Sequence, residues 1–241
     1  MQNSLGAISP QTYVRTAGLL YLIVIILGGF AYGYVPSRLI SHDAATTANN
    51  ILAHEFLWRI AIVSGLIMVI CAIPLLLCEY VLLRPVHRAA ALLAVFFNLI
   101  SLAIESISGL GHLAALLILK GVDSMKAFDP GQLRALALLS ADLHDYEVMV
   151  SFVFFGCVCL IYGYLIFRSG FFPRFLGVLM AIAGLCYLTN SLAGFLGLDL
   201  AAGGFPWMLL PAGLSELTFC LWLLVMGVNA GKWQEKARLV T

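Results

Sequence analysis

Charged side chains are scarce in this chain. Aspartate, glutamate, lysine and arginine make up 10% of its 241 residues, whereas a soluble domain usually carries about 25%. Hydrophobic residues make up 62%. A soluble fold of this size could not hide so much apolar surface, because folded proteins still expose a large part of their chain to water. The composition therefore predicts a protein that has a lipid bilayer as its partner and solvent.

A surplus of either charge is also missing. The formal net charge is +1, whereas a nucleic-acid partner needs a basic face that neutralises phosphates. We therefore expect no nucleic-acid partner. The length leaves no room for a separate soluble domain. We expect one transmembrane domain over residues 16–228, between a cytoplasmic segment at 1–15 and a cytoplasmic tail at 229–241.

Cysteine is absent from the predicted loops, which excludes a secreted disulfide framework. All six cysteines lie inside apolar runs, where small apolar packing residues are expected: Cys71, Cys78, Cys157, Cys159, Cys186 and Cys220. The chain also lacks the HExxH, CxxC, GxSxG, P-loop and GxGxxG motifs. We therefore expect no metal and no cofactor.

Long apolar runs are abundant, and a transmembrane helix needs roughly 20 such residues. The runs predict six spans, over residues 16–35, 56–83, 89–119, 146–167, 172–196 and 206–228. Residues 131–145 form an apolar stretch too short to cross a bilayer, directly before an acidic cluster. We expect a short surface or bent helix there. The predicted fold class is all-α, a polytopic transmembrane helical bundle of six spans plus that one short helix.

Lysine and arginine set the expected orientation, because cytoplasmic loops are enriched in them. One side of the six-span arrangement holds eight: Arg15, Arg84, Arg88, Arg168, Arg174, Lys232, Lys236 and Arg238. The other side holds five: Arg38, Arg59, Lys120, Lys126 and Arg134. We therefore expect both termini in the cytoplasm, with Trp58 in an aromatic belt at the outer interface.

Ionisable groups inside a span are costly and are therefore candidate functional residues. Asn98, Glu105 and His112 follow one another at intervals of seven in the third span, so they share one stripe of a helix. Glu216 is a second deep carboxyl, about halfway along the sixth span. These four residues are our candidates for a polar cavity or for proton handling, and Glu216 could share a proton with Glu105.

A second group of polar residues opens the fourth span. It comprises Asp142, His144, Asp145 and Glu147, which could form an outer-face site together with His112. Imidazole and carboxylate are the ligands that many metals prefer, but no metal-ligand spacing is present. His112 and His144 could also hold a haem, but a transmembrane electron carrier would need further histidines at inner depth. A solvated acidic rim with hydrogen bonds between helices explains the group more simply.

Several motifs resemble those of a known family. They are Arg15-Thr16-Ala17-Gly18, Leu82-Leu83-Arg84-Pro85, Ala127-Phe128-Asp129-Pro130 and Phe167-Arg168-Ser169-Gly170, followed by Pro173-Arg174-Phe175-Leu176-Gly177 and Glu216. In this order they resemble a bacterial integral-membrane family catalogued as domain of unknown function 4386. The resemblance covers nearly the whole chain. It implies a protein of the bacterial inner membrane and supplies neither an activity nor catalytic residues.

Three functions remain open from the sequence. The first is a membrane protein that handles a small molecule, an ion or a proton through a polar cavity lined by the third and sixth spans. The second is an intramembrane enzyme or metal-binding protein with the outer-face site. The third is a non-catalytic module that binds lipid or a partner helix through the small-residue faces at Gly29–Gly33 and Gly177–Ala181.

Overall fold

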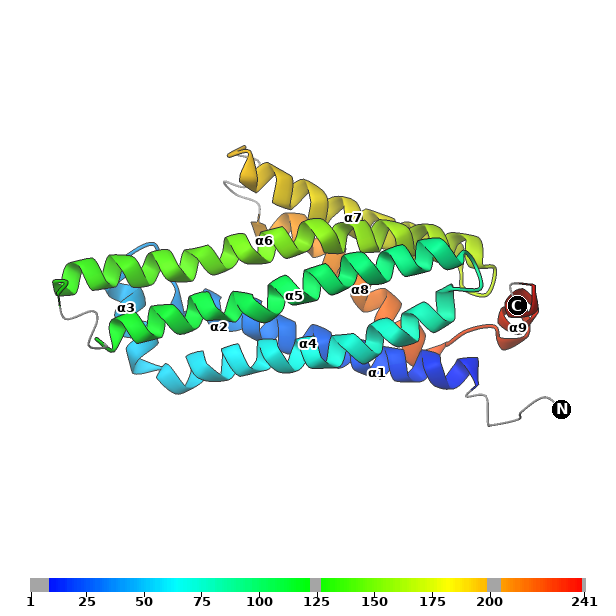
Figure 1. Ribbon diagram of the computed structural model, residues 1–241, viewed down its shortest axis with the longest axis horizontal. Helices are drawn as coiled ribbons and strands as arrows, with labels where there is room; N and C mark the ends of the chain where they lie inside the picture. Colours follow the sequence, from blue (N-terminus) through cyan, green and yellow to red (C-terminus); the bar gives the residue numbers. More distant parts are fainter. Residues whose placement is uncertain (1–8, 122–126, 199–204, 240–241) are drawn as a thin grey trace. The chain divides into compact units, whose positions relative to one another are not determined.

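The computed structural model describes residues 9–121, 127–198 and 205–239, and these residues form helices and short connections without a strand (Figure 1). The helices, in chain order, are α1 (Pro10–Gly28), η1 (Gly29–Tyr34), α2 (Val35–Leu39), α3 (Ala44–Ala53), α4 (Glu55–Leu83), α5 (Arg88–Leu119), α6 (Pro130–Ser169), α7 (Arg174–Phe195), α8 (Phe205–Val225) and α9 (Ala230–Arg238). η1 is a π-helix that continues α1. Lys126 and the turn that carries Asp199 lie outside the described residues.

Five of the described helices are long and apolar enough to cross a membrane. They are Pro10–Leu39, Glu55–Leu83, Arg88–Leu119, Pro130–Ser169 and Arg174–Phe195. A sixth candidate is the apolar α8, which is followed by α9 at an angle of 97°. The prediction of an all-α transmembrane bundle is confirmed, with five to six helices that can span.

The stretch at 131–145 is helical, as expected. It is the first part of α6, which continues without interruption over 40 residues. At 1.5 Å per residue such a helix is about 60 Å long, twice the roughly 30 Å of a bilayer's hydrocarbon core. A helix continues through the acidic cluster because its backbone hydrogen bonds do not depend on apolar side chains. The short helices in the described part of the chain are η1, α2, α3 and α9.

The side chains follow the pattern of a membrane protein. Large apolar residues face outward on the spans, as shown by Ile70, Leu110 and Leu185, which are 65%, 61% and 57% exposed. Polar residues such as His144 and Asn190 are buried instead. In water this distribution would be unfavourable, whereas in lipid the exposed apolar surface carries no cost.

The chain divides into two compact units. Unit 1 comprises Met1–Ile23, Cys71–Ser101 and Phe152–Thr241, and unit 2 comprises Val24–Ile70 and Leu102–Ser151. The boundaries fall inside α1, α4, α5 and α6, so each of these helices contributes to both units.

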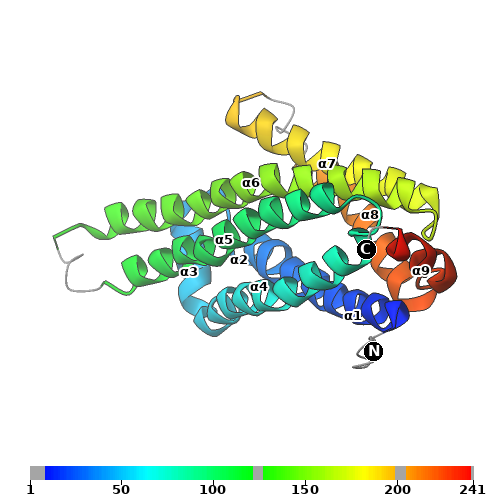
Figure 2. The same ribbon diagram turned by 45° about the vertical axis from the view of Figure 1, so that its right-hand side comes forward.

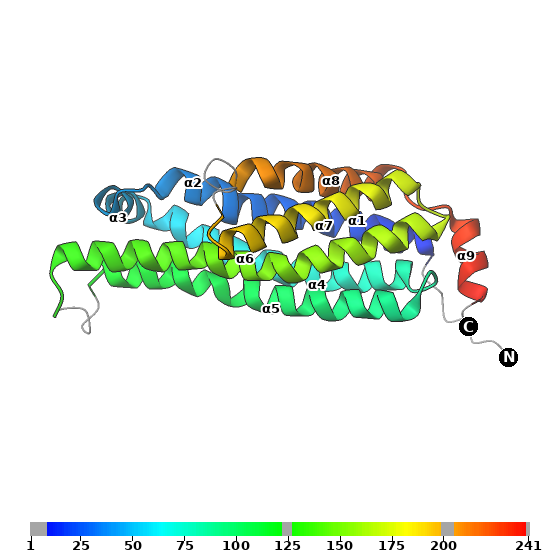
Figure 3. The ribbon, with the colours of Figure 1, turned by 90° about the horizontal axis from the view of Figure 1, so that it is seen from above.

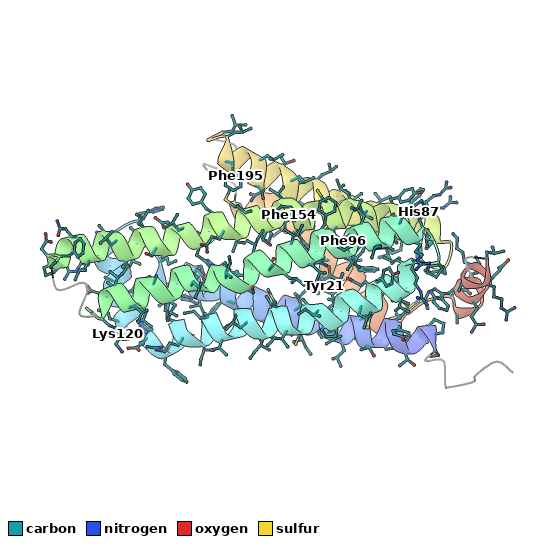
Figure 4. All side chains as sticks on the ribbon, in the orientation of Figure 1. Tyr21, His87, Phe96, Lys120, Phe154 and Phe195 are labelled. Atoms are coloured by element: carbon teal, nitrogen blue, oxygen red, sulfur yellow. The ribbon has the colours of Figure 1, made fainter. Side chains whose placement is uncertain are left out.

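Unit 1 is held together by close helix packing. A Cβ placed on Gly177 of α7 would lie 2.6 Å from the Gly163 carbonyl oxygen of α6, and one on Gly184 would lie 2.7 Å from the Gly156 carbonyl oxygen. Only glycine allows backbones to approach so closely. Tyr21 of α1, labelled in Figure 4, packs edge-on against Phe219 of α8 at a ring-centroid distance of 6.3 Å.

Unit 2 has its own apolar core around Trp58, which is completely buried. The other core residues are Val35, Leu39, Ile51, Ala61, Ala115, Leu116, Ala137 and Ala141. The expectation of Trp58 in an interfacial belt was therefore wrong. Its indole NH donates to the His112 carbonyl oxygen at 2.8 Å, so the residue is polar at its tip and buried by its neighbours. Ile51 joins α3 to this core.

Candidate functional site

The candidate site of unit 2 is a pocket between four helical segments. Its lining comes from η1, α4, α5 and α6: Ala31, Tyr32, Ala61, Ile62, Gly65, Leu66, Glu105, Ser106, Gly109, His112 and His144. Among the described lining residues none comes from α8, so the expected contribution of the sixth span is not part of this pocket. Three of the candidates expected from the sequence, Glu105, His112 and His144, meet here.

Glu105 is positioned by α6. The Ser151 hydroxyl of α6 donates to Glu105 Oε1 at 2.5 Å, across the interface between α5 and α6. This distance lies at the short end of the range for O–H···O hydrogen bonds. Glu105 is half-buried rather than turned to lipid, and it lies on the same helical face as the completely buried Ser108.

His144 has a defined hydrogen-bonding arrangement. Its Nδ1 lies 2.9 Å from the Ser108 carbonyl oxygen. A carbonyl oxygen only accepts hydrogen bonds, so Nδ1 carries the hydrogen in this contact. In the neutral ring, Nε2 then presents a lone pair. His144 Nε2 is buried and has no hydrogen-bond partner among the described residues.

His112 lies against His144. The two ring centroids are 3.7 Å apart at an interplanar angle of 31°. His112 Nε2 is likewise buried and without a hydrogen-bond partner in the described part of the chain. Buried polar atoms are usually satisfied, so two such imidazole nitrogens on residues that line one pocket indicate a place for water or a small ligand.

Aromatic rings hold the histidine pair on both sides. Trp58 packs on His112 at a centroid distance of 4.4 Å, and Tyr32 packs on His144 at 5.5 Å. Tyr32 extends from the π-helix η1, a type of local widening that is frequent at functional sites. A Cβ on Gly65 would lie 3.1 Å from the Tyr32 hydroxyl oxygen, so a larger residue at position 65 would crowd the phenol ring.

The pocket is small. Its open space amounts to about 260 Å³ when the mouth is included, but only about 10 Å³ is open to the centre of a water molecule. That is about the room of one water, whereas pockets for organic ligands measure roughly 300–1,000 Å³. The site therefore suits a proton or a water better than an organic molecule.

The expected outer-face site separates into different environments. Asp142 and Asp145 are exposed, whereas His144 is 1% exposed and faces α5. Glu147 is partly buried, and its Oε2 has no hydrogen-bond partner in the described part of the chain. Residues 142 and 145 leave the face of 144 because a helix turns by 100° per residue. Within the described residues, no group of three or more histidines, cysteines and acids could hold a metal ion.

Unit 1 contains a different polar cluster, to which Glu216 belongs. The Tyr187 hydroxyl of α7 donates to Glu216 Oε1 at 2.5 Å. Glu79 of α4 is also buried there, at 6% exposure, within electrostatic reach of Glu216. Asn98, the first residue of the predicted stripe, lies beside Tyr162 in this cluster. The stripe of α5 thus supplies Asn98 to unit 1, and Glu105 and His112 to unit 2.

Sequence reasoning did not select Glu79, Tyr32 or Tyr187. Glu79 lies four residues before the end of α4, where a carboxylate would ordinarily reach water. A signal was nevertheless present, because Glu79 is flanked by apolar residues on both sides and the next arginine follows five positions later. Tyr32 and Tyr187 are aromatic residues within apolar runs, which the sequence does not separate from core residues.

The small-residue faces have different roles. Gly177 and Ala181 pack against Gly163 inside unit 1, so this face is used within the chain. A Cβ on Gly29 or Gly33 would meet no described atom within 4 Å.

The chain is similar to proteins whose function is uncharacterised. One relative is an uncharacterised protein of Archaeoglobus fulgidus, 24% identical over 168 residues, which covers 69% of this chain and 83% of the relative. No solved structure matches the chain significantly. The family model described as a domain of unknown function, DUF4386, matches residues 16–227, so the chain belongs to this family.

Proposed function

We propose that the protein takes up and releases protons at the pocket of unit 2, as part of ion or small-molecule handling at the membrane. The observation that carries this proposal concerns His112 and His144, which line one pocket together with Glu105. The Nε2 atom of each is buried and has no hydrogen-bond partner among the residues that the structure describes. Imidazole and carboxyl groups are the side chains that most often accept and donate protons.

Chemistry supports a proton over other cargoes. The Glu105 carboxyl accepts a hydrogen bond, and His144 Nε2 is an acceptor in the neutral tautomer that its Nδ1 contact favours, so these groups suit a proton or a water that donates. The room for about one water excludes a larger organic ligand from the pocket as it stands. A water there could carry a proton between Glu105 and the imidazoles, since polar groups this far into a transmembrane helix are typical of proton relays.

Proton flux into vesicles tests the proposal. The purified full-length protein is reconstituted into vesicles with a trapped pH-sensitive dye, and a potassium gradient with valinomycin drives protons inward. We expect faster acidification than in empty vesicles. Glu105→Gln should slow the protein-dependent flux by about tenfold or more, because the amide cannot exchange a proton. Wild-type flux equal to that of empty vesicles would overturn the proposal, provided that the re-extracted protein is still monodisperse.

Matched variants separate the pocket from general effects. Glu235→Gln removes an exposed carboxylate of α9 and should leave the flux unchanged. His144→Gln removes the lone pair but keeps an amide that can donate to the Ser108 carbonyl, and it should slow the flux. His42→Gln removes an exposed imidazole and should not. Equal effects of His144→Gln and His42→Gln would argue against the pocket.

A further inference from the structure

One end of unit 1 carries a helix that lies across the others. The chain turns by 97° between Leu209–Val225 and α9, and Figures 1, 2 and 3 show α9 crosswise to α8. Two side chains of α9, Trp233 and Lys236, bind the ends of other helices. The Trp233 indole NH donates to the Leu82 carbonyl oxygen of α4 at 3.0 Å. The Lys236 ammonium donates to the carbonyl oxygens of Arg168 and Ser169 at the end of α6, at 2.6 and 3.1 Å.

Basic side chains gather at this end of unit 1. They come from the turn between α4 and α5, the turn between α6 and α7, and α9: Arg84, Arg88, Arg168, Arg174, Lys232, Lys236 and Arg238. His87, labelled in Figure 4, marks the first of these turns. Within the described part of the three segments the one carboxylate side chain is Glu235. The end is therefore strongly positive.

Some of these cations already have a structural role. Lys236 binds the last carbonyls of α6, where the negative end of the helix dipole favours a cation. Arg174 lies over the Phe167 ring, with its guanidinium carbon 5.4 Å from the centroid. Arg84, Arg88, Arg168 and Lys232 are exposed and have no carboxylate within 4 Å among the described residues. These are available to an external anion.

We propose that this end of unit 1 binds the phosphate group of an anionic phospholipid headgroup. A helix perpendicular to a spanning helix lies along the membrane surface, and a tryptophan anchored there is typical of the interface. A phosphate group supplies the negative counter-charge that the four exposed cations lack among the described residues. Each lysine or arginine near an anionic surface contributes about 1 kcal/mol, which converts to roughly fivefold in affinity.

Neighbouring apolar side chains favour a lipid over a soluble phosphate. Tyr164, Phe167 and Phe175 are 50%, 43% and 48% exposed on α6 and α7, next to Arg168 and Arg174. Inorganic phosphate has no apolar group that could pack on these rings, whereas the acyl chains of a phospholipid would cover them. The cations and the rings together match an amphiphile with an anionic head.

Thermal unfolding of the purified full-length protein in a neutral detergent tests this site. Added phosphatidylglycerol should raise the unfolding midpoint saturably by several degrees, because a ligand that binds the folded state stabilises it. Phosphatidylcholine at equal concentration should raise it less. Inorganic phosphate should leave it unchanged. An equal effect of both lipids, or saturation by inorganic phosphate alone, would overturn the proposal of an anionic lipid site.

A double variant and a matched control locate the effect. Arg168→Gln with Lys232→Gln removes two exposed cations of the site and should weaken phosphatidylglycerol binding by roughly 10- to 30-fold. Arg38→Gln with Arg134→Gln removes two exposed cations of unit 2 and should not. Midpoints without lipid show whether either variant has lost stability by itself. Equal weakening by both pairs would mean general charge attraction and would contradict a site.

Discussion

At the residue scale, the two carboxyls that stood out in the predicted spans, Glu105 and Glu216, each have a hydroxyl partner. Glu105 accepts from Ser151 and Glu216 accepts from Tyr187, both at 2.5 Å. An unpaired carboxylate within a bilayer costs at least a few kcal/mol, so such partners explain how the helices tolerate these residues. In both hydrogen bonds the donating hydroxyl belongs to a neighbouring helix, so each bond links two helices that can span.

Glu105 variants should separate folding from proton handling. Glu105→Gln keeps a carbonyl oxygen that accepts from Ser151, so we expect a change in unfolding free energy below about 1 kcal/mol. Glu105→Leu removes the acceptor and leaves the Ser151 hydroxyl with one partner fewer in a buried place, which should cost about 1–3 kcal/mol. Thermal unfolding in one detergent measures both. Equal stability of the leucine variant and the wild type would show that the contact does not hold α5 to α6.

Sequence reasoning succeeded for single ionisable residues and was less successful for their partners. Glu105, His112, His144 and Glu216 stand out because an ionisable group inside an apolar run needs an explanation. Their partners depend on which helix faces meet, and a single sequence does not contain that information. The sequence therefore suggested one cavity lined by the third and sixth spans, whereas in the structure the candidates form two clusters, one in each unit.

At the element scale, glycines decide how closely helices pack. Gly177→Ala would place a Cβ 2.6 Å from backbone atoms of α6, and backbone cannot move aside as a flexible side chain can. Such overpacking costs about 1–3 kcal/mol, more than the roughly 1 kcal/mol that alanine adds in helix propensity. We expect a lower unfolding midpoint. Gly29→Ala, whose Cβ meets no described atom, should leave the midpoint equal or raise it. The reverse order of the two midpoints would contradict the packing of α6 against α7.

The short helix α3 should respond to acid through its N-cap residue, Asp43. Asp43 caps the helix by accepting from the Thr46 hydroxyl at 2.6 Å and from the Thr46 amide at 2.7 Å, and these bonds lower the pKa of the carboxyl below its ordinary value of 3.8. A lowered folded-state pKa means that the contribution is complete above the ordinary value and is lost as the pH falls through the folded-state pKa.

Hydrogen exchange of residues 44–53 checks this expectation. After correction for intrinsic rates, wild-type protection should fall below about pH 4. Asp43→Asn keeps a capping oxygen without a titrating group, so its protection should be less dependent on pH. Asp43→Ala should show lower protection already at pH 7. Wild-type protection in the alanine variant would exclude a role of the cap.

Helix boundaries show what an apolar pattern can predict. Backbone groups inside a bilayer must be satisfied within the helix, so each long apolar run had to be helical. The first four predicted runs fall within observed helical segments, and the last two extend past the ends of α7 and α8 by up to three residues. Residues 131–145 are helical as expected and belong to the same helix, α6, as the fourth predicted span. The apolar pattern alone does not separate this from a bent arrangement, because polar residues allow a helix as well as a break. The basic tail forms α9, which begins at the Asn229 cap, where the Asn229 side chain accepts from the Lys232 amide at 3.1 Å.

At the scale of the whole molecule, the arrangement in the membrane is a prediction from the basic residues. α5 joins His87 to Lys120, both labelled in Figure 4, so the two residues flank one candidate span. In a background without native cysteines, single cysteines at His87 and Asp129 should react with a membrane-impermeant label from opposite sides. His87 should be accessible from the cytoplasmic side. Labelling from the same side would contradict a spanning α5.

The tautomer of His144 tests the central claim about the pocket most directly. In histidine-labelled protein in bilayers, the ¹⁵N chemical shift separates a protonated ring nitrogen from an unprotonated one, and the signals absent from His144→Gln identify the residue. We predict hydrogen on Nδ1, which donates to the Ser108 carbonyl, and an unprotonated Nε2 whose signal moves in Glu105→Gln but not in Glu235→Gln. A hydrogen on Nε2 with a bare Nδ1, insensitive to Glu105, would contradict the account, because the pocket would then hold no open acceptor at His144.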